Sequence, residues 1–403
     1  MDNPYFYVFC GFHHFSYNED NSKNDKEMER MTMSNLQTPF RYDFVGSFLR
    51  PEKLKAAKKA FEEGTITKEE LDRVTDECVT EIVAKQKAAG FHAITDGEFR
   101  RKFWHLDFMW GFEGVAHEKD GGGVQFHGEM ADLEATYLVG KVKAKAHPFV
   151  EYFKFLKQFE DGQTVAKYTI PAPAQMYQQM IVPQNIGQTR KFYVTDEELI
   201  EDIGKAYQDV IKQFYAAGCR NLQLDDCTWG AIVGDAAKQR YQSLGVDIEE
   251  VKARLLKVNN LALENRPEDM VITSHICRGN YHSTFFTSGP YDSVADYVFA
   301  QEHVDALLLE YDDERSGGFA PLAKVSPDKK VVLGLITTKK PELEDKDKVI
   351  ARIHEAAKYI PLERLCLSPQ CGFASCEIGN KLTEEQQWAK LALVKEIAEE
   401  VWK

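Results

Sequence analysis

Two residues with metal-binding side chains follow an apolar run in the second half of the chain. The segment 271–280, VITSHICRGN, places His275 and Cys277 two positions apart at the end of that run. Because side chains alternate along a strand, both would leave the strand on one face and converge. Glu310 closes the apolar run VDALLLE, and Cys371 comes directly after RLCLSPQ. One imidazole, two thiols and a carboxylate form a donor set that suits tetrahedral zinc.

Each of these residues also has an ordinary structural interpretation. A free cysteine is usually a small buried hydrophobic residue, and a single histidine is often a core residue whose hydrogen bonds are satisfied. A purely structural zinc is a further alternative, although such sites more often use local Cys-x-x-Cys pairs. What favours a functional site is the shared position of the four residues, each at or just past the end of an apolar run.

Carboxylates occupy the same kind of position elsewhere in the chain. Asp96 and Glu98 follow the run FHAIT, and Asp225 and Asp226 follow NLQL. Enzymes built as parallel α/β barrels carry their active groups at the C-terminal ends of the strands. The sequence therefore predicts that these carboxylates share a site with the four candidate metal ligands.

The elements that must position these residues alternate between strands and helices. Apolar runs of strand length occur near residues 42–46, 91–95, 165–170, 221–225, 271–275, 305–310, 331–336 and 364–368. Helical patterns cover residues 68–89, 196–217, 248–263, 293–303, 346–359 and 383–401. Strands that alternate with helices form parallel sheets, and eight repeats is the number that closes a (β/α)8 TIM barrel. An open doubly wound sheet is the alternative, but no Gly-x-Gly-x-x-Gly motif follows an early strand.

Two segments fall outside this repeating pattern. Residues 1–37 lack the basic start and clean apolar stretch of a secretory signal, and we expect a disordered N-terminal extension before a single barrel domain over 38–403. Residues 100–160 are too long for one connecting helix and contain three consecutive glycines and the alternating stretch YLVGKVKAKAHPF. We expect an inserted β-ribbon after the second strand, forming part of the substrate wall. A contact between two copies in a homodimer is the alternative role.

The composition limits the partners of the protein. Of 403 residues, 50 are Lys or Arg and 64 are Asp or Glu, so the net charge is −14. We therefore do not expect nucleic acid or anionic membrane surfaces as partners, and we expect small-molecule substrates. No apolar run reaches the roughly 20 residues needed to span a bilayer. The eight cysteines are scattered through a large chain, which favours reduced thiols and a cytoplasmic location.

The ligands of the predicted metal site restrict the reactions that the metal can support. Zinc held by two thiolates, an imidazole and a carboxylate is electron-rich, which makes it a poor Lewis acid for splitting water. It can still bind a substrate thiol, lower the thiol pKa from about 8.5 and keep the sulfur nucleophilic. Glu310 is the hardest of the four ligands and is thus the natural one to exchange for that thiol. The residues therefore predict alkyl transfer to sulfur.

Six short motifs together resemble a known family: VGSF, TDGE, LQLDD, HICRGN, LLLEYDDE and SPQCGF. From about Phe40 to the end, the chain is similar to the C-terminal catalytic barrel of cobalamin-independent methionine synthase. The resemblance implies a zinc site made of His275, Cys277, Glu310 and Cys371. It also implies homocysteine as the thiol substrate and 5-methyltetrahydrofolate as the methyl donor. The sequence provides no counterpart of the family's additional N-terminal barrel.

The resemblance implies further groups that bind the substrates. In the family, the amino-acid end of homocysteine is held by groups that match Ser47, Glu98 and Asp225. Carboxylates suit the ammonium, and a hydroxyl suits the carboxylate. Tyr177 takes the place of a tryptophan beside the pterin, and Lys339 takes the place of a histidine near the proton transfer. A lysine could protonate N5 of the folate only if its pKa were strongly lowered.

Three alternatives are compatible with these residues. Within the same class, the zinc site could transfer an alkyl group from another donor or to another thiol. A related barrel lyase, such as a uroporphyrinogen-decarboxylase-like enzyme, would need no metal and would favour arginines that hold substrate carboxylates. A non-enzymatic protein with a structural zinc is the third alternative.

Overall fold

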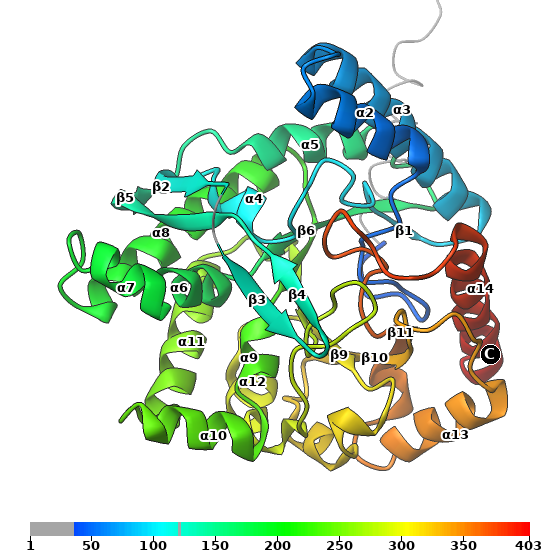
Figure 1. Ribbon diagram of the computed structural model, residues 1–403. Coiled ribbons are helices and arrows are strands. Elements are labelled where there is room, and N and C mark those ends of the chain that lie inside the picture. Colours follow the sequence, from blue (N-terminus) through cyan, green and yellow to red (C-terminus); the bar gives the residue numbers. More distant parts are fainter. Residues whose placement is uncertain (1–35, 120–121) are drawn as a thin grey trace, which may run out of the picture.

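Seven parallel strands form the central sheet of the protein, described by a computed structural model over residues 36–119 and 122–403 (Figure 1). The order β1-β6-β7-β8-β9-β10-β11 follows the sequence, so each strand pairs with the next after a crossover. The strands are β1 (Ala93–Ile94), β6 (Val165–Pro171), β7 (Asn221–Asp225), β8 (Val271–Ile276), β9 (Ala306–Glu310), β10 (Lys330–Ile336) and β11 (Leu365–Pro369). Almost every residue of these strands is buried, as expected for a parallel sheet covered on both faces.

Helices surround the sheet on the outside (Figure 1). The longer ones are α2 (Glu52–Glu62), α3 (Lys68–Ala88), α5 (Pro148–Lys157), α8 (Asp196–Ala216), α10 (Gly234–Ser243), α11 (Ile248–Leu263), α13 (Lys346–Ala356) and α14 (Glu384–Val401). Shorter ones are α4 (Leu106–Met109), α6 (Pro173–Ile181), α7 (Pro183–Thr189), α9 (Cys227–Ala231) and α12 (Ala295–Gln301). Capping boxes at Thr67 and Thr383 set the starts of α3 and α14 by satisfying free backbone N–H groups. Within the described ranges, no helix has both the length and the apolar character that a bilayer crossing requires.

The expected first strand near residues 42–46 is not a regular strand. Tyr42 makes a single parallel bridge to Leu367 of β11, supported by hydrogen bonds of 2.9 Å on either side. The Asp43 carboxylate accepts a hydrogen bond from the backbone N–H of Phe44 at 2.8 Å, which competes with a continued ladder. The other seven expected strands lie where the sequence pattern predicts them.

The segment nonetheless contributes to the inside of the sheet. Val45 packs with Leu308, Val332 and Cys366 in a small apolar cluster separate from the main core. The flanking residues of these strands, such as Leu307, belong to the main core instead. Because side chains alternate along a strand, the small cluster marks the inner face and the main core lies mostly under the helices.

The segment between β1 and β6 contains the β-ribbon that the sequence indicates. Two small antiparallel sheets form there, β2 (Glu113–Glu118) with β5 (Ala135–Lys143), and β3 (Gly123–Phe126) with β4 (Glu129–Asp132). The β3–β4 hairpin projects from the body of the protein in front of the sheet (Figure 1). The final part of the predicted insertion is α5, one of the outer helices. Of the predicted N-terminal extension, residues 1–35 lie outside the described residues.

Candidate metal centre and substrate cavity

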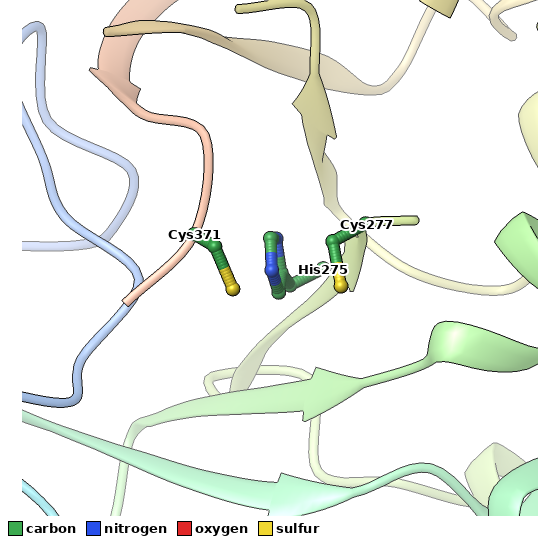
Figure 2. A group of neighbouring side chains, drawn as sticks. All are labelled: His275, Cys277 and Cys371. Carbon is green, nitrogen blue, oxygen red and sulfur yellow. The ribbon is translucent and has the colours of Figure 1, made fainter. Parts of the chain in front are cut away.

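Three of the four predicted metal ligands converge on one point. Potential ligand atoms of His275, Cys277 and Cys371 all lie within 4.8 Å of one another. Figure 2 shows the His275 ring, from the end of β8, between the sulfurs of Cys277, directly after β8, and Cys371, from the loop after β11. All three residues are buried, with exposed fractions of 3%, 2% and 5%. The period-two spacing of His275 and Cys277 thus places both on the face that meets Cys371.

The hydrogen bonds of His275 leave one ring nitrogen free for a metal. Its Nδ1 lies 3.3 Å from the carbonyl oxygen of Leu308, which accepts a hydrogen bond from the ring. Its buried Nε2 has no hydrogen-bond partner among the described residues. A metal-binding histidine commonly donates one ring N–H to a carbonyl and offers the other nitrogen to the metal. The free imidazole nitrogen and the two thiols therefore fit a zinc ion.

The two thiols both have raised pKa values. The pKa of Cys277 is raised well above its ordinary value by its contact with Cys227 and by burial. The pKa of Cys371 is raised in the same way by its contact with Cys277 and by burial. A thiol binds zinc as the thiolate, so metal binding at this position must release protons.

Glu310, the fourth predicted ligand, is not part of the group of mutually close ligand atoms. Its carboxylate is fully buried and accepts a hydrogen bond of 2.9 Å from the backbone N–H of Arg278. The same carboxylate pairs with Arg315 at 3.4 Å and with Lys339 at 3.9 Å. Burial raises the pKa of Glu310, while Lys339 acts in the opposite direction. Glu310 therefore lies at the end of β9, where the sequence places it, but it is held by cationic partners.

A cavity of about 320 Å³ connects the metal group with the predicted substrate residues. His275, Cys277 and Cys371 share its wall with Ser47, Glu98 and Asp225.

The two carboxylates of this wall, Asp225 and Glu98, lie in different surroundings. Asp225 has its pKa raised to about 8, first by burial and then by the neighbouring charge of Glu98. One oxygen of Glu98 accepts from the Thr169 hydroxyl at 2.9 Å, and the other has no partner among the described residues. Glu98 also has a left-handed backbone with φ of 61°, which is uncommon for a residue other than glycine. Both features fit a site that receives a cationic group.

The other two predicted functional residues do not line the cavity. Tyr177 lies on α6 with 1% of its surface exposed, whereas its neighbours Gln175 and Gln178 do line the cavity. Residues two apart on a helix face different directions, so Tyr177 and Gln175 occupy different faces of α6.

Lys339 belongs to the charged group behind the metal residues. Its ammonium lies 3.9 Å from Glu310 and 3.8 Å from Asp312. Burial lowers the pKa of Lys339, but the two carboxylates outweigh this effect and the net shift is upward. A proton donor for a folate would need a lowered pKa, so the environment of Lys339 opposes that role.

Cys227 and His105 are among the residues of the cavity wall that the sequence analysis did not single out. The Sγ atom of Cys227, at the start of α9, lies 3.3 Å from the Sγ atom of Cys277. The sequence signal was available, because Cys227 follows the strand-end pair in LQLDD. His105 stacks on Trp104 with ring centroids 4.5 Å apart, and its buried Nδ1 has no partner among the described residues. Burial lowers the pKa of His105 to about 3, so it is a neutral hydrogen-bonding group.

A family profile described as "Cobalamin-independent synthase, Catalytic domain" matches residues 42–400. The chain belongs to this family. Bacillus subtilis YxjG, described only as an uncharacterized protein, is 42% identical over 385 residues, covering 95% of this chain and 100% of YxjG. The family membership confirms the resemblance seen in the sequence motifs.

Solved structures extend the comparison. A Listeria monocytogenes structure, named as a candidate vitamin-B12-independent methionine synthase, is 36% identical with a TM-score of 0.72, covering 92% of this chain and 100% of that one. A B12-independent methionine synthase from Shewanella, solved with selenomethionine, is 19% identical with a TM-score of 0.69, covering 90% of this chain and 98% of that one. The latter likeness supports the fold. The family thus connects this chain to methionine synthases, and this chain has a buried His/Cys/Cys group that could bind a metal.

Proposed function

We propose that the protein is a zinc-dependent methyltransferase that moves a methyl group to the thiol of homocysteine and so forms methionine. The observation that carries this proposal is a single cavity whose wall contains both the His275, Cys277 and Cys371 group and the Glu98 and Asp225 carboxylates. The Shewanella relative was solved with selenomethionine, the selenium analogue of methionine. A metal-free decarboxylase-like lyase and a purely structural zinc are both less consistent with this shared wall.

The metal residues would hold zinc through one nitrogen and two sulfurs. When bound, zinc would lower the pKa of a coordinated substrate thiol and keep its sulfur nucleophilic. Glu310 would take the fourth position only by turning away from Arg315 and Lys339, since its carboxylate is paired with both. An incoming thiol that displaces Glu310 would return the carboxylate to these cations, which makes Glu310 the exchangeable ligand.

The substrate residues would hold the amino-acid end of homocysteine. An ammonium between Glu98 and Asp225 would relieve the repulsion and the desolvation that raise the pKa of Asp225. The hydroxyl of Ser47, on the same wall, can donate a hydrogen bond to the substrate carboxylate. This anchoring would fix the thiol toward the metal residues and leave the rest of the cavity for the methyl donor.

Two chemical classes of methyl donor fit this cavity. The family resemblance implies 5-methyltetrahydrofolate, which must be protonated at N5 before the methyl group can leave. Lys339 does not line the cavity and its pKa is raised, whereas His105 lines the cavity and its pKa is lowered to about 3. These two observations favour, as a second candidate, an already activated donor such as a methylsulfonium compound or a methyl-corrinoid. Trp104, His105 and Gln175 would form the part of the cavity that holds either donor.

We also propose that the sheet closes as a (β/α)8 barrel. Residues 41–43 pair with β11, and the backbone N–H of Phe48 donates to the carbonyl of Gly97, just after β1, at 3.1 Å. The first segment would thus occupy the eighth position between the two edge strands.

The proposal can be tested on zinc-loaded protein by X-ray absorption at the zinc edge. Saturating homocysteine should add one sulfur to the metal shell, because the substrate thiol replaces Glu310. A methyl-transfer assay under single-turnover conditions, with each donor in turn, then identifies the donor. Asp225→Asn is the informative variant, since it should weaken homocysteine binding while zinc content is kept. An unchanged metal shell at saturating thiol would overturn the proposal.

A further inference from the structure

A third thiol touches the metal group and has no role in the function proposed above. The Sγ atoms of Cys227 and Cys277 are 3.3 Å apart, which is direct contact between two sulfurs. Cys227 is partly exposed and lines the cavity, whereas Cys277 is 2% exposed. A small molecule that enters the cavity therefore reaches Cys227 more readily than its neighbour.

The two cysteines follow the paired ends of two neighbouring strands, Cys227 at the start of α9 after β7 and Cys277 directly after β8. β7 and β8 pair in parallel with Asp225 opposite His275, an offset of 50 residues that also separates Cys227 from Cys277. The backbone N–H of Asp226 donates to the His275 carbonyl at 2.8 Å, so the pairing extends beyond the strands. Neighbouring strands lie about 4.8 Å apart, and disulfides join Cα atoms roughly 4.4–6.8 Å apart.

The helix that begins at Cys227 is pressed against the backbone of Cys277. A Cβ atom placed on Gly230 of α9 would lie 1.8 Å from the Cys277 carbonyl oxygen, so only glycine permits this approach. This close packing keeps the backbones of the two cysteines near each other.

We propose that Cys227 and Cys277 are an oxidation site that forms a reversible disulfide with peroxide as the oxidant. In the first step, the Cys227 thiol takes one oxygen from the peroxide and becomes a sulfenic acid, and one water is released. In the second step, the Cys277 sulfur attacks the Cys227 sulfur, the S–S bond forms and a second water leaves. Two thiols lose two electrons and two hydrogens, and hydrogen peroxide is reduced to two waters. A dithiol reductant reverses the reaction by exchange.

The same geometry disfavours the other thiols of the cavity as partners. Cys371 comes from the loop after β11, and two strands, β9 and β10, separate β11 from β8 in the sheet. Its sulfur reaches Cys277 across the metal position, but its backbone belongs to a distant strand. Cys376 also lines the cavity, and its sulfur makes no hydrogen bond to another sulfur in the described structure.

The disulfide would have a consequence for metal binding. Cys277 is one of three buried residues that converge on the metal position, and its sulfur cannot serve both a disulfide and a zinc ion. Oxidation would therefore release the metal. This consequence rests on the proposed zinc site, whereas formation of the disulfide itself does not.

The test uses full-length protein, both zinc-free and zinc-loaded, treated with one equivalent of hydrogen peroxide. Intact mass should fall by two hydrogens, and peptide mapping without reductant should link Cys227 to Cys277. A chromophoric chelator should record release of about one zinc per chain in step with the disulfide. Dithiothreitol should restore both the mass and zinc binding. Cys227→Ser should abolish the linked peptide and the coupled zinc release, and Cys376→Ser, the matched control from the same cavity, should retain both.

Two results would overturn the proposal. One is a peptide that links Cys277 to Cys371 as the main product in zinc-free wild-type protein. The other is oxidation of Cys227 alone to the sulfinic acid, with Cys277 still a free thiol. If instead the Cys227–Cys277 disulfide forms but no zinc binds to the reduced protein, the oxidation site stands and the proposed zinc function fails, so the two ideas are separable.

Discussion

Replacing Glu310 by glutamine tests two roles of this residue separately, as a zinc ligand and as the negative partner of buried cations. The Glu310 carboxylate is completely buried and is flanked by the Arg278 N–H at 2.9 Å, Arg315 at 3.4 Å and Lys339 at 3.9 Å. A glutamine preserves the shape and can still accept the N–H hydrogen bond, but it removes the negative charge. We expect Glu310→Gln to keep zinc, because His275 and the two thiols remain, and to lose stability.

The size of that loss follows from the burial of the partners. Removing one member of a buried ion pair costs about 3–5 kcal/mol, because the other charge is left without compensation. Here Asp312 remains 3.8 Å from the Lys339 ammonium, and its side chain is 1% exposed. The remaining carboxylate compensates part of the charge, so the expected loss for Glu310→Gln lies at the low end, about 3 kcal/mol.

Two measurements check this reasoning. Elemental analysis after dialysis against a weak chelator gives the zinc content, and urea unfolding of the zinc-free protein gives the stability. Glu302→Gln is the matched control, since Glu302 is also fully buried, has a pKa raised to about 8 by burial, and does not line the cavity. If Glu310→Gln lost zinc as completely as His275→Ala, while Glu302→Gln kept it, Glu310 would be an essential ligand and the argument for exchange would be wrong.

The remaining predictions concern the thiols, the substrate carboxylate and the donor. Cys277→Ser and Cys371→Ser should each reduce bound zinc strongly in elemental analysis, since hydroxyls are poor zinc ligands; full retention in both would contradict the metal site. The pKa of Asp225 is raised to about 8 in the folded protein, so the wild type should lose stability as pH rises from about 4 to 8. Asp225→Asn cannot ionise at this position, so its melting temperature relative to that of the wild type should rise over this pH range. If the two melting temperatures changed with pH in parallel, the raised pKa of Asp225 would be refuted. Single-turnover transfer should be faster from a methylsulfonium donor than from 5-methyltetrahydrofolate, because Lys339 stays protonated; fast folate turnover that survives Lys339→Met would defeat this expectation.

Much of the architecture was determined locally in the sequence. Apolar runs and amphipathic patterns predicted seven of the strands and most of the outer helices, because a buried parallel strand and a helix with one apolar face need only their own residues to be recognised. The positions of His275, Cys277 and Cys371 at strand ends follow from the same patterns. Since strand ends of a parallel sheet share one edge, their convergence could be predicted without coordinates.

The tertiary structure alone decided which groups meet and in what charge state. No residue next to Lys339 in the sequence offsets the burial of its ammonium, yet Glu310 and Asp312 come from a neighbouring strand end to do so. Tyr177 and Gln175 differ only in which face of α6 they occupy, and the packing of that helix selects the glutamine for the cavity. The first segment carries a strand-like pattern but makes one bridge, because the hydrogen bonds of Asp43 compete with the ladder. Burial and long-range pairing set these outcomes, and neither is encoded in the spacing of residues along the chain.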